Sequence, residues 1–193
     1  MRVFLAVLIL IFSLQSSTKA DDIRDFEIEG MSLGESLLDF FSEEEILNGI
    51  RKDSYEYTDR KFIDTNLRGS WFNVYDSVQI TIKRNDKKYI IYSVDGGIFF
   101  QRDDDSCIRI MNQIIDELTL IFKDSVKVKQ EVREHPQDPS GKSTTQGASF
   151  FLYNGSVSSR CYLWSDTMKI ENYVAVSTRA KEFNDWLRSY MTQ

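Results

Sequence analysis

The chain has 193 residues, 41% of them hydrophobic, which is enough for one domain with a substantial core. Its formal net charge of -6 makes nucleic acid and anionic lipid surfaces poor general partners. The single histidine excludes a zinc site built from histidines, and no cofactor motif stands out. We therefore expect no cofactor, no metal ion and no nucleic-acid partner.

The first 20 residues have the anatomy of a secretory signal peptide. Arg2 precedes an apolar run of about 12 residues, which is short for a membrane span of about 20. Residues 18–20, Thr-Lys-Ala, fit cleavage directly after Ala20. We predict that residues 1–20 are removed and that residues 21–193 form a single domain, periplasmic or secreted, with no stable membrane span.

The N-terminal part of this domain begins with an acidic lead-in, where Phe26 and Ile28 could form a short strand. Ser32 and Ser42 then each begin a capping box, a serine followed three residues later by a glutamate. Apolar residues follow each box at helical spacing. The sequence predicts two small helices that meet at a bend near Ser42.

The stretch 51–70 is polar and aromatic and predicts a long connection with one short strand at most. Long connections often carry binding residues, so a binding loop is one interpretation. An ordinary crossing over one end of a sheet is the other.

Strands follow. Residues 78–83 alternate apolar and polar side chains, which is typical of a half-buried strand. Asn85-Asp86 marks a turn and residues 88–94 return as the partner strand. Asp95-Gly96-Gly97 predicts a second turn, with a third strand over residues 98–100.

A central helix is predicted from Ser106 to Phe122, with Asp105 or Ser106 as its N-cap. Its apolar residues recur at steps of three and four: Ile108, Met111, Ile115, Leu118 and Phe122. The triplet 103–105 of aspartates could instead bind calcium. We favour capping, because no glycine-centred ligand loop with a terminal glutamate is present.

The second half of the chain predicts three more strands and a last helix. Residues 126–132 fit a strand or a helix tail, and residues 135–147 form a proline- and glycine-containing loop. Two strands meet at an Asn154-Gly155 hairpin, and another spans 168–176. Ser177 or Thr178 is expected to cap the final helix.

This order of elements predicts an α+β fold: an antiparallel sheet of about five to six strands, with helices packed mainly on one face. Cys107 and Cys161 lie 54 positions apart, one at a helix start and one in a strand. In an exported protein such a pair favours a structural disulfide over a redox pair, which would usually be Cys-x-x-Cys. Closing this loop stabilises a fold by roughly 4 kcal/mol.

Motifs for catalysis are weak. Gly141-Lys142-Ser143 is similar to the tail of a phosphate-binding loop, but Pro136 stands where that loop needs glycine. His135, which any catalytic triad would have to use, lies in the most loop-like segment. Asp and Glu residues are too numerous for any pair to stand out. We predict no catalytic residues and lean against an enzyme.

Aromatic residues are numerous along the predicted strands. Phe99-Phe100 and Phe150-Phe151 each place one ring on either face of the sheet. One face must meet the helices, and the other is either covered as well or exposed as a binding surface. The candidate residues for such a surface are Tyr55, Tyr57, Trp71, Tyr75, Tyr92 and Trp164.

The segment 25–46, DFEIEGMSLGESLLDFFSEEEI, resembles the start of small exported proteins of marine alphaproteobacteria. The resemblance covers mainly residues 21–50, and no activity is attached to that group. It implies a bacterial periplasm.

Three functions fit these observations. The first is a non-catalytic module of the cell envelope that binds a small molecule or an envelope protein. The second is a carboxylate-based hydrolase acting on envelope material, which would need two Asp or Glu residues facing each other across a cleft. The third is a structural or assembly protein that uses an aromatic sheet face.

Overall fold

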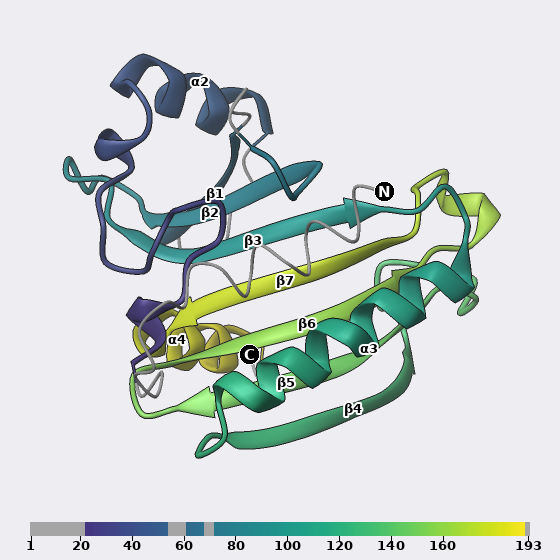
Figure 1. Cartoon of the computed structure of the whole chain (residues 1–193). Coiled ribbons are helices and arrows are strands. Elements are labelled where there is room, and N and C mark those ends of the chain that lie inside the picture. Colours follow the sequence, from purple (N-terminus) through teal and green to yellow (C-terminus); the bar gives the residue numbers. More distant parts are fainter. Residues whose placement is uncertain (1–21, 54–60, 68–71, 192–193) are drawn as a thin grey trace.

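The computed structural model describes residues 22–53, 61–67 and 72–191, and the predicted signal peptide lies outside these ranges. Their main feature is one antiparallel sheet of seven strands (Figure 1). In chain order the strands are β1 (Phe62–Leu67), β2 (Ser77–Lys83), β3 (Ile91–Phe99), β4 (Val126–Glu134), β5 (Thr144–Leu152), β6 (Gly155–Leu163) and β7 (Tyr173–Ala180). The α-helices are α2 (Glu43–Asp53), α3 (Asp104–Ile121) and α4 (Lys181–Met191). The α+β class is confirmed, with seven strands rather than five to six.

Two meanders, β1–β3 and β4–β7, make up the sheet, whose order is β1-β2-β3-β7-β6-β5-β4. Helix α3 follows β3, lies over β6 and β5, and leads to β4 at the far edge (Figure 1). Strand β7 then returns to the middle, where it pairs with β3 and β6. The two meanders therefore join at the centre of the sheet, and β4 stands at an edge.

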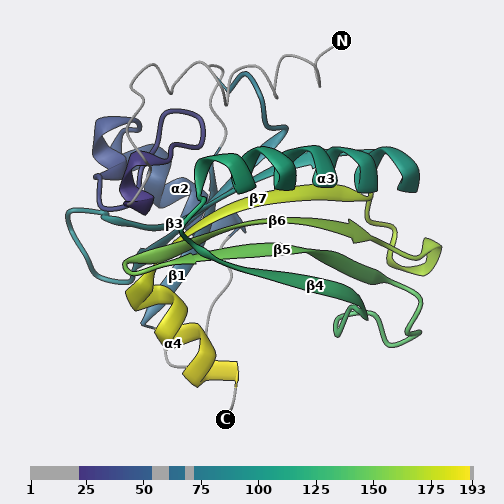
Figure 2. The same cartoon turned by 60° about the horizontal axis from the view of Figure 1, so that its bottom comes forward.

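Helix α3 covers one face of the sheet (Figure 2). Its N-cap is Asp103, whose carboxylate accepts a hydrogen bond from the Ser106 backbone N–H at 3.0 Å. The cap thus lies before the predicted positions, Asp105 and Ser106. Almost fully buried on the same side of the sheet are Ala148, Phe150, Val157, Val174 and Val176. This layer forms the main hydrophobic core.

A disulfide ties α3 to the sheet. It joins Cys107, in the first turn of α3, to Cys161 in β6, with 5.8 Å between their Cα atoms. Both residues are fully buried. The predicted bridge between a helix start and a strand is confirmed.

Helix α4 packs on the opposite face, at one end of the sheet (Figure 2). Its Phe183 and Trp186 enclose Phe62 of β1, with ring centroids 5.0 and 4.9 Å away. Helices were expected mainly on one face of the sheet. Helix α4 differs, because it covers part of the second face and leaves the rest of that face open. In the part of the chain that the structure describes, no helix combines the length and apolar character needed to cross a membrane.

Strand β3 corrects one prediction. Residues 95–97 do not turn, and β3 runs through them to Phe99. A Cβ on Gly96 would lie 2.5 Å from the ring of Tyr75, and one on Gly97 would lie 2.8 Å from the Ser77 hydroxyl oxygen. These glycines therefore serve close packing inside a strand rather than a change of direction.

The prediction of a first small helix in the N-terminal segment is also wrong. In place of a helix over residues 33–41 there is a single 3-10 turn, Leu37–Asp39. Gly34 has φ +89°, which takes the backbone out of the helical region. The Ser32 N–H still donates to the Glu35 carboxylate at 2.8 Å, so the capping-box contact forms without a helix behind it. The second box does open α2, since the Ser42 N–H donates to the Glu45 carboxylate at 2.8 Å.

The C-terminal half confirms the hairpin and moves two boundaries. Residues 126–134 form a strand rather than a helix tail, and the hairpin turn is Tyr153-Asn154, with Gly155 already in β6. Ser177 and Thr178 are buried inside β7 and do not cap α4. The final strand, predicted over residues 168–176, thus runs from Tyr173 to Ala180, and residues 166–168 form a 3-10 turn instead.

Candidate functional site

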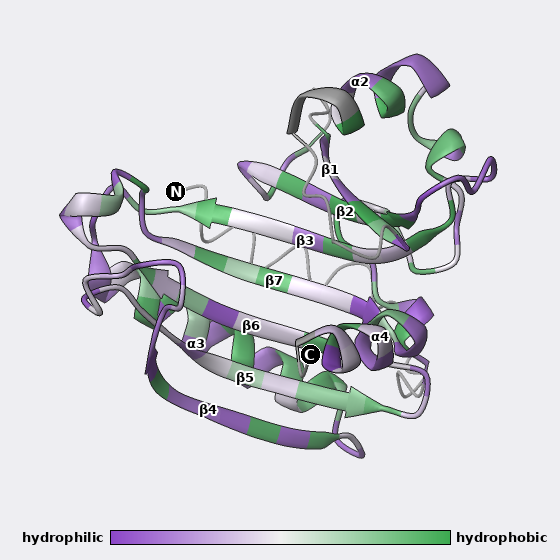
Figure 3. Ribbon diagram, turned by 180° about the vertical axis from the view of Figure 1, so that it is seen from behind, coloured by the Kyte–Doolittle hydropathy of each residue, from purple (hydrophilic) through white to green (hydrophobic). Residues whose placement is uncertain are grey.

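The strand register arranges the side chains of the open face in rows across the sheet, because paired residues of antiparallel strands project to the same side. One row consists of successive partners from β1 to β5: Asn66, Gln79, Asp95, Ser177, Ser158 and Ser149. The next consists of Ser77, Gly97, Ala175, Arg160 and Gly147. Most of these residues are small and polar. Figure 3 shows this face, with hydrophilic segments on β4, β6 and β7.

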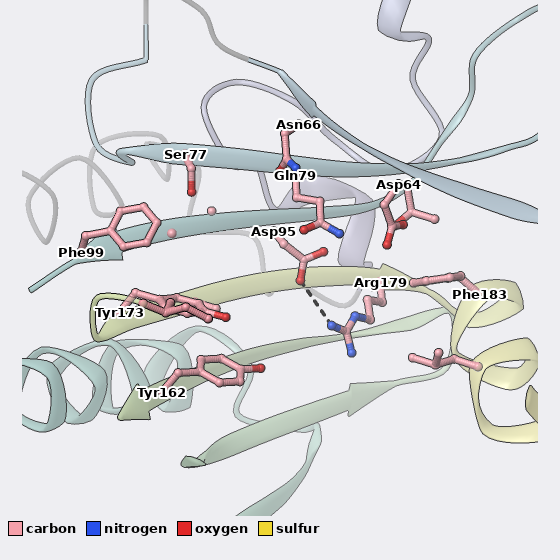
Figure 4. Close-up of a pocket in the computed structure, with 16 residues that line it drawn as sticks. Asp64, Asn66, Ser77, Gln79, Asp95, Phe99, Tyr162, Tyr173, Arg179 and Phe183 are labelled. Carbon is pink, nitrogen blue, oxygen red and sulfur yellow. Dashed lines mark hydrogen bonds and ion pairs between the residues drawn. The ribbon is translucent and has the colours of Figure 1, made fainter. Parts of the chain in front are cut away.

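Small side chains leave a hollow over β1, β2, β3 and β7. Its volume is about 670 Å³, within the range of small-molecule sites. Gly97 and Ala175 form part of its floor, and Phe183 and Leu187 of α4 border it. Figure 4 shows Phe99, Tyr173 and Tyr162 towards the other end of the same hollow.

Charged groups in the hollow are paired with one another. Arg179 lies at the centre, and its Nη2 is 3.3 Å from Oδ1 of Asp95 (Figure 4). The Ser93 hydroxyl donates to the other Asp95 oxygen at 2.7 Å. Asp64, which is buried, accepts a hydrogen bond from the Thr81 hydroxyl at 2.6 Å. Each charge of the hollow is therefore held by a neighbouring strand.

Arg160 lies on the same face but turns away from the hollow. Its guanidinium donates to the Gln130 side-chain oxygen at 2.8 Å and to the Ser149 hydroxyl at 3.1 Å. Burial and the nearby Arg179 lower the pKa of Arg160, which remains a cation because arginine titrates far above neutral pH. Arg160 thus occupies the β4–β5 side of the face.

Aromatic rings form a continuous row at one end of the hollow. Phe99 and Tyr173 have centroids 5.6 Å apart, and Tyr173 stacks on Tyr162 at 4.7 Å. His135 continues the row, 5.7 Å from Tyr162 and 4.4 Å from Trp164. Burial raises the pKa of Tyr173 and lowers that of His135, so both rings are neutral at neutral pH.

Neutral polar groups complete the lining. The Ser77 hydroxyl, the Gln79 amide and the Tyr173 hydroxyl have no hydrogen-bond partner among the described residues. Gln79 is labelled in Figure 4 among the side chains that line the hollow. Because these groups both donate and accept hydrogen bonds, the hollow can bind hydroxyl or amide groups of a ligand.

The predicted surface residues do not gather at one place. Tyr75 is buried on the α3 side, against Gly96, and Tyr92 packs on Phe62 at 5.3 Å. Trp164 joins the aromatic row through His135. The remaining three, Tyr55, Tyr57 and Trp71, lie outside the described residues.

Sequence reasoning missed the residues that line the hollow. Gln79 was visible as a polar position of an alternating strand, and Phe99 as a member of an aromatic pair that places one ring on each face. Asp95 and Arg179 carry no local signal, because only the pairing of β3 with β7 brings them together.

The loop before β5 is held by a buried carboxylate. Asp138 accepts five hydrogen bonds, from the N–H and hydroxyl groups of Ser140 and Ser143 and from the hydroxyl of Ser165. Hydrogen bonds from these serines, of which the one from Ser143 has the largest effect, hold the pKa of Asp138 well below its usual range. The Asp138 carboxylate thus binds Ser143 of the Gly-Lys-Ser segment, which accounts for this serine without a phosphate.

Within the described ranges, no three His, Cys, Asp or Glu side chains are grouped so that they could hold a metal ion. The fold and the hollow define a class: an α+β sheet protein with one helix-covered face and one open, hollowed face. No protein-family model matches the chain, and no curated protein or solved structure shows significant similarity to it. The resemblance of residues 25–46 to exported alphaproteobacterial proteins stays a prediction.

Proposed function

We propose that the protein is an exported, non-catalytic binding module of the cell envelope, and that the hollow on its open face holds a small molecule. The observation that carries this proposal is the hollow itself, about 670 Å³ in volume. It combines aromatic rings, paired charges and unpartnered neutral polar groups, which is the composition of a specific ligand site.

Export is supported by two independent features. Residues 1–20 have the pattern of a signal peptide, with cleavage near Ala20. The Cys107–Cys161 disulfide is the kind of bond that forms and persists in oxidising compartments such as the periplasm. The proposed location is therefore the periplasm or the exterior of the cell.

A non-catalytic role is supported by the state of the reactive side chains. His135 lies between two aromatic rings, and its Nδ1 accepts a hydrogen bond from the Gln137 N–H at 3.3 Å. Both cysteines are joined to each other. Asp95 is paired with the guanidinium of Arg179 at 3.3 Å and accepts a hydrogen bond from the Ser93 hydroxyl at 2.7 Å.

The test is native mass spectrometry of the mature protein purified from its own host. We expect a bound small molecule in the wild type and its loss in Ala175→Phe, which fills the floor of the hollow. Val128→Phe is the matched control, since Val128 is an exposed position on β4 outside the lining. A bare protein in all three samples would contradict the proposal.

A carboxylate-based hydrolase is the second candidate, and one observation favours it. Asp64 and Asp95 line the same hollow from β1 and β3, with β2 between them. Two strand spacings and a register offset of two residues place their backbones roughly 12 Å apart, a separation that side chains can shorten towards the range of inverting glycosidases. Turnover of an envelope glycan that is lost in both Asp64→Asn and Asp95→Asn would establish this function instead.

An assembly role through the aromatic face is the third candidate. Phe99 and Tyr162 line a hollow, and a flat aromatic patch would suit a protein partner better. Analytical ultracentrifugation separates the two: the binding module is a monomer whose mass does not change in Phe99→Ala. Self-association that disappears in this variant would favour assembly.

A further inference from the structure

We infer that the ligand of the hollow is a neutral carbohydrate of at least two sugar rings. The inference rests on the proposed function, because it names the class of small molecule that the same hollow would bind. Three properties of the lining lead to it: the pairing of its charges, the nature of its unpartnered polar groups, and the length of its aromatic row.

The charged side chains among the described residues of the hollow are already paired within the protein, so they offer no free counter-charge to an ionic ligand. Arg179 already pairs with Asp95, and Asp95 also accepts from Ser93. Asp64 is buried and bonded to Thr81. A charged ligand would lose its hydration without gaining an available counter-ion, which costs free energy unless one of these contacts breaks. The hollow therefore favours a neutral molecule.

The unpartnered polar groups of the hollow are suited to bind hydroxyl groups of a ligand. The Ser77 hydroxyl, the Gln79 amide and the Tyr173 hydroxyl each supply at least one donor and one acceptor. A sugar hydroxyl also does both, so neighbouring hydroxyls can bridge these groups without leaving a polar atom unpaired. An apolar ligand would leave all three without partners and would bind weakly.

Aromatic rings at the other end suit the apolar face of a sugar. Phe99 is 39% exposed, so the face of its ring is accessible, whereas Tyr173 and Tyr162 stack face to face on each other and continue the row across β7 and β6. The electron-rich face of an aromatic ring attracts the C–H groups that a pyranose presents on one side. Three adjacent strands span roughly 10 Å, which exceeds one sugar ring. A disaccharide or a longer chain therefore fits the row.

Five disaccharides, three neutral, one cationic and one anionic, test the ligand class. The neutral probes are cellobiose, maltose and N,N′-diacetylchitobiose, the cationic probe is chitobiose without its acetyl groups, and the anionic probe is digalacturonic acid. Saturation-transfer NMR detects binding, and calorimetry gives the Kd. We expect at least one neutral probe to bind, and both charged probes to bind at least tenfold more weakly.

Variants of the mature chain locate the binding. Gln79→Ala and Phe99→Ala should each weaken the neutral probe at least tenfold, because they remove a hydrogen-bonding amide and a stacking ring. Tyr153→Ala is the matched aromatic control, since Tyr153 is 71% exposed at the β5–β6 turn, outside the hollow. It should leave the Kd unchanged.

The outcomes separate this inference from the proposed function. Tighter binding of a charged probe would overturn the carbohydrate inference and leave the binding module standing. The same holds if every probe fails while native mass spectrometry finds another small molecule that is lost in Ala175→Phe. Failure of every probe together with a bare protein from the host would overturn both.

Discussion

The two faces of the sheet are built from the same strands but differ in the side chains that they present. On the face under α3, Val157, Val174 and Val176 are completely buried and form a continuous apolar layer. On the other face, the same strands present Tyr173 and Arg179 to the hollow and Arg160 to the β4–β5 side. A strand that alternates in this way stabilises the fold with one face and leaves the other available for binding.

This difference predicts separable effects of mutation. Apolar burial and the disulfide on the α3 face supply stability, at roughly 25 cal/mol for each Å² of apolar surface removed from water. The open face contributes less, because its polar groups exchange water for one another at a small net gain. Substitutions on the first face should change the free energy of unfolding, and those on the second should change ligand binding.

The largest expected effect is loss of the disulfide. Cys107→Ala combined with Cys161→Ala should lower the free energy of unfolding by about 4 kcal/mol, because the loop of 54 residues is no longer closed in the unfolded chain. Urea denaturation measures it. A loss below about 1 kcal/mol would mean that the bridge contributes little and that packing alone fixes α3 on the sheet.

An effect of similar size is expected for one of two adjacent phenylalanines on β5. Phe150 is 1% exposed in the core beneath α3, so Phe150→Ala should cost about 3–5 kcal/mol. Phe151 faces the other side, where it contacts the Arg188 guanidinium at 5.5 Å, and Phe151→Ala should cost about 1 kcal/mol. Equal losses in urea denaturation would break the comparison of the two faces.

A smaller effect should appear in acid. The pKa of Asp138 is lowered by hydrogen bonds from Ser143, Ser165 and Ser140, so the folded state favours the ionised carboxylate. Its contribution to stability is fully present above the ordinary aspartate pKa of about 4 and is lost as the pH falls below that value. Asp138→Asn should therefore lower Tm by several degrees at pH 7 and by less at pH 3.

The control for the acid experiment is Asp116→Asn, on the exposed side of α3. Its Tm should follow the wild-type curve at both pH values. If Asp138→Asn lowers Tm equally at pH 7 and pH 3, the hydrogen bonds of Asp138 do not stabilise the fold through its ionised carboxylate.

Much of the layered architecture could be predicted from local patterns. Alternation over residues 78–83 identified β2 and both of its faces, and helical spacing identified α3. The pair Phe99-Phe100 was expected to place one ring on each face, and it does: Phe99 lines the hollow and Phe100 packs against the core. These features depend on a few neighbouring residues, so the sequence alone is sufficient.

The remaining features depend on contacts between distant segments. Gly96 and Gly97 were interpreted as a turn, because only the packing of Tyr75 and Ser77 explains them inside a strand. The hollow could not be predicted, since it requires the register of β2, β3 and β7, which brings Gln79 beside Asp95 and Asp95 beside Ser177. Composition of one strand gives no information on its neighbours.

Two adjacent residues at the end of β3 test the central claim most directly, that one face stabilises and the other binds. Phe99 lines the hollow, whereas Phe100 packs against the core. Native mass spectrometry and a melting curve of Phe99→Ala and Phe100→Ala, each purified from the protein's own host, measure both properties. We predict that Phe99→Ala loses the bound small molecule and keeps its Tm, and that Phe100→Ala keeps the molecule and melts several degrees lower. Retention of the molecule by Phe99→Ala, or its loss from a folded Phe100→Ala, would contradict the account.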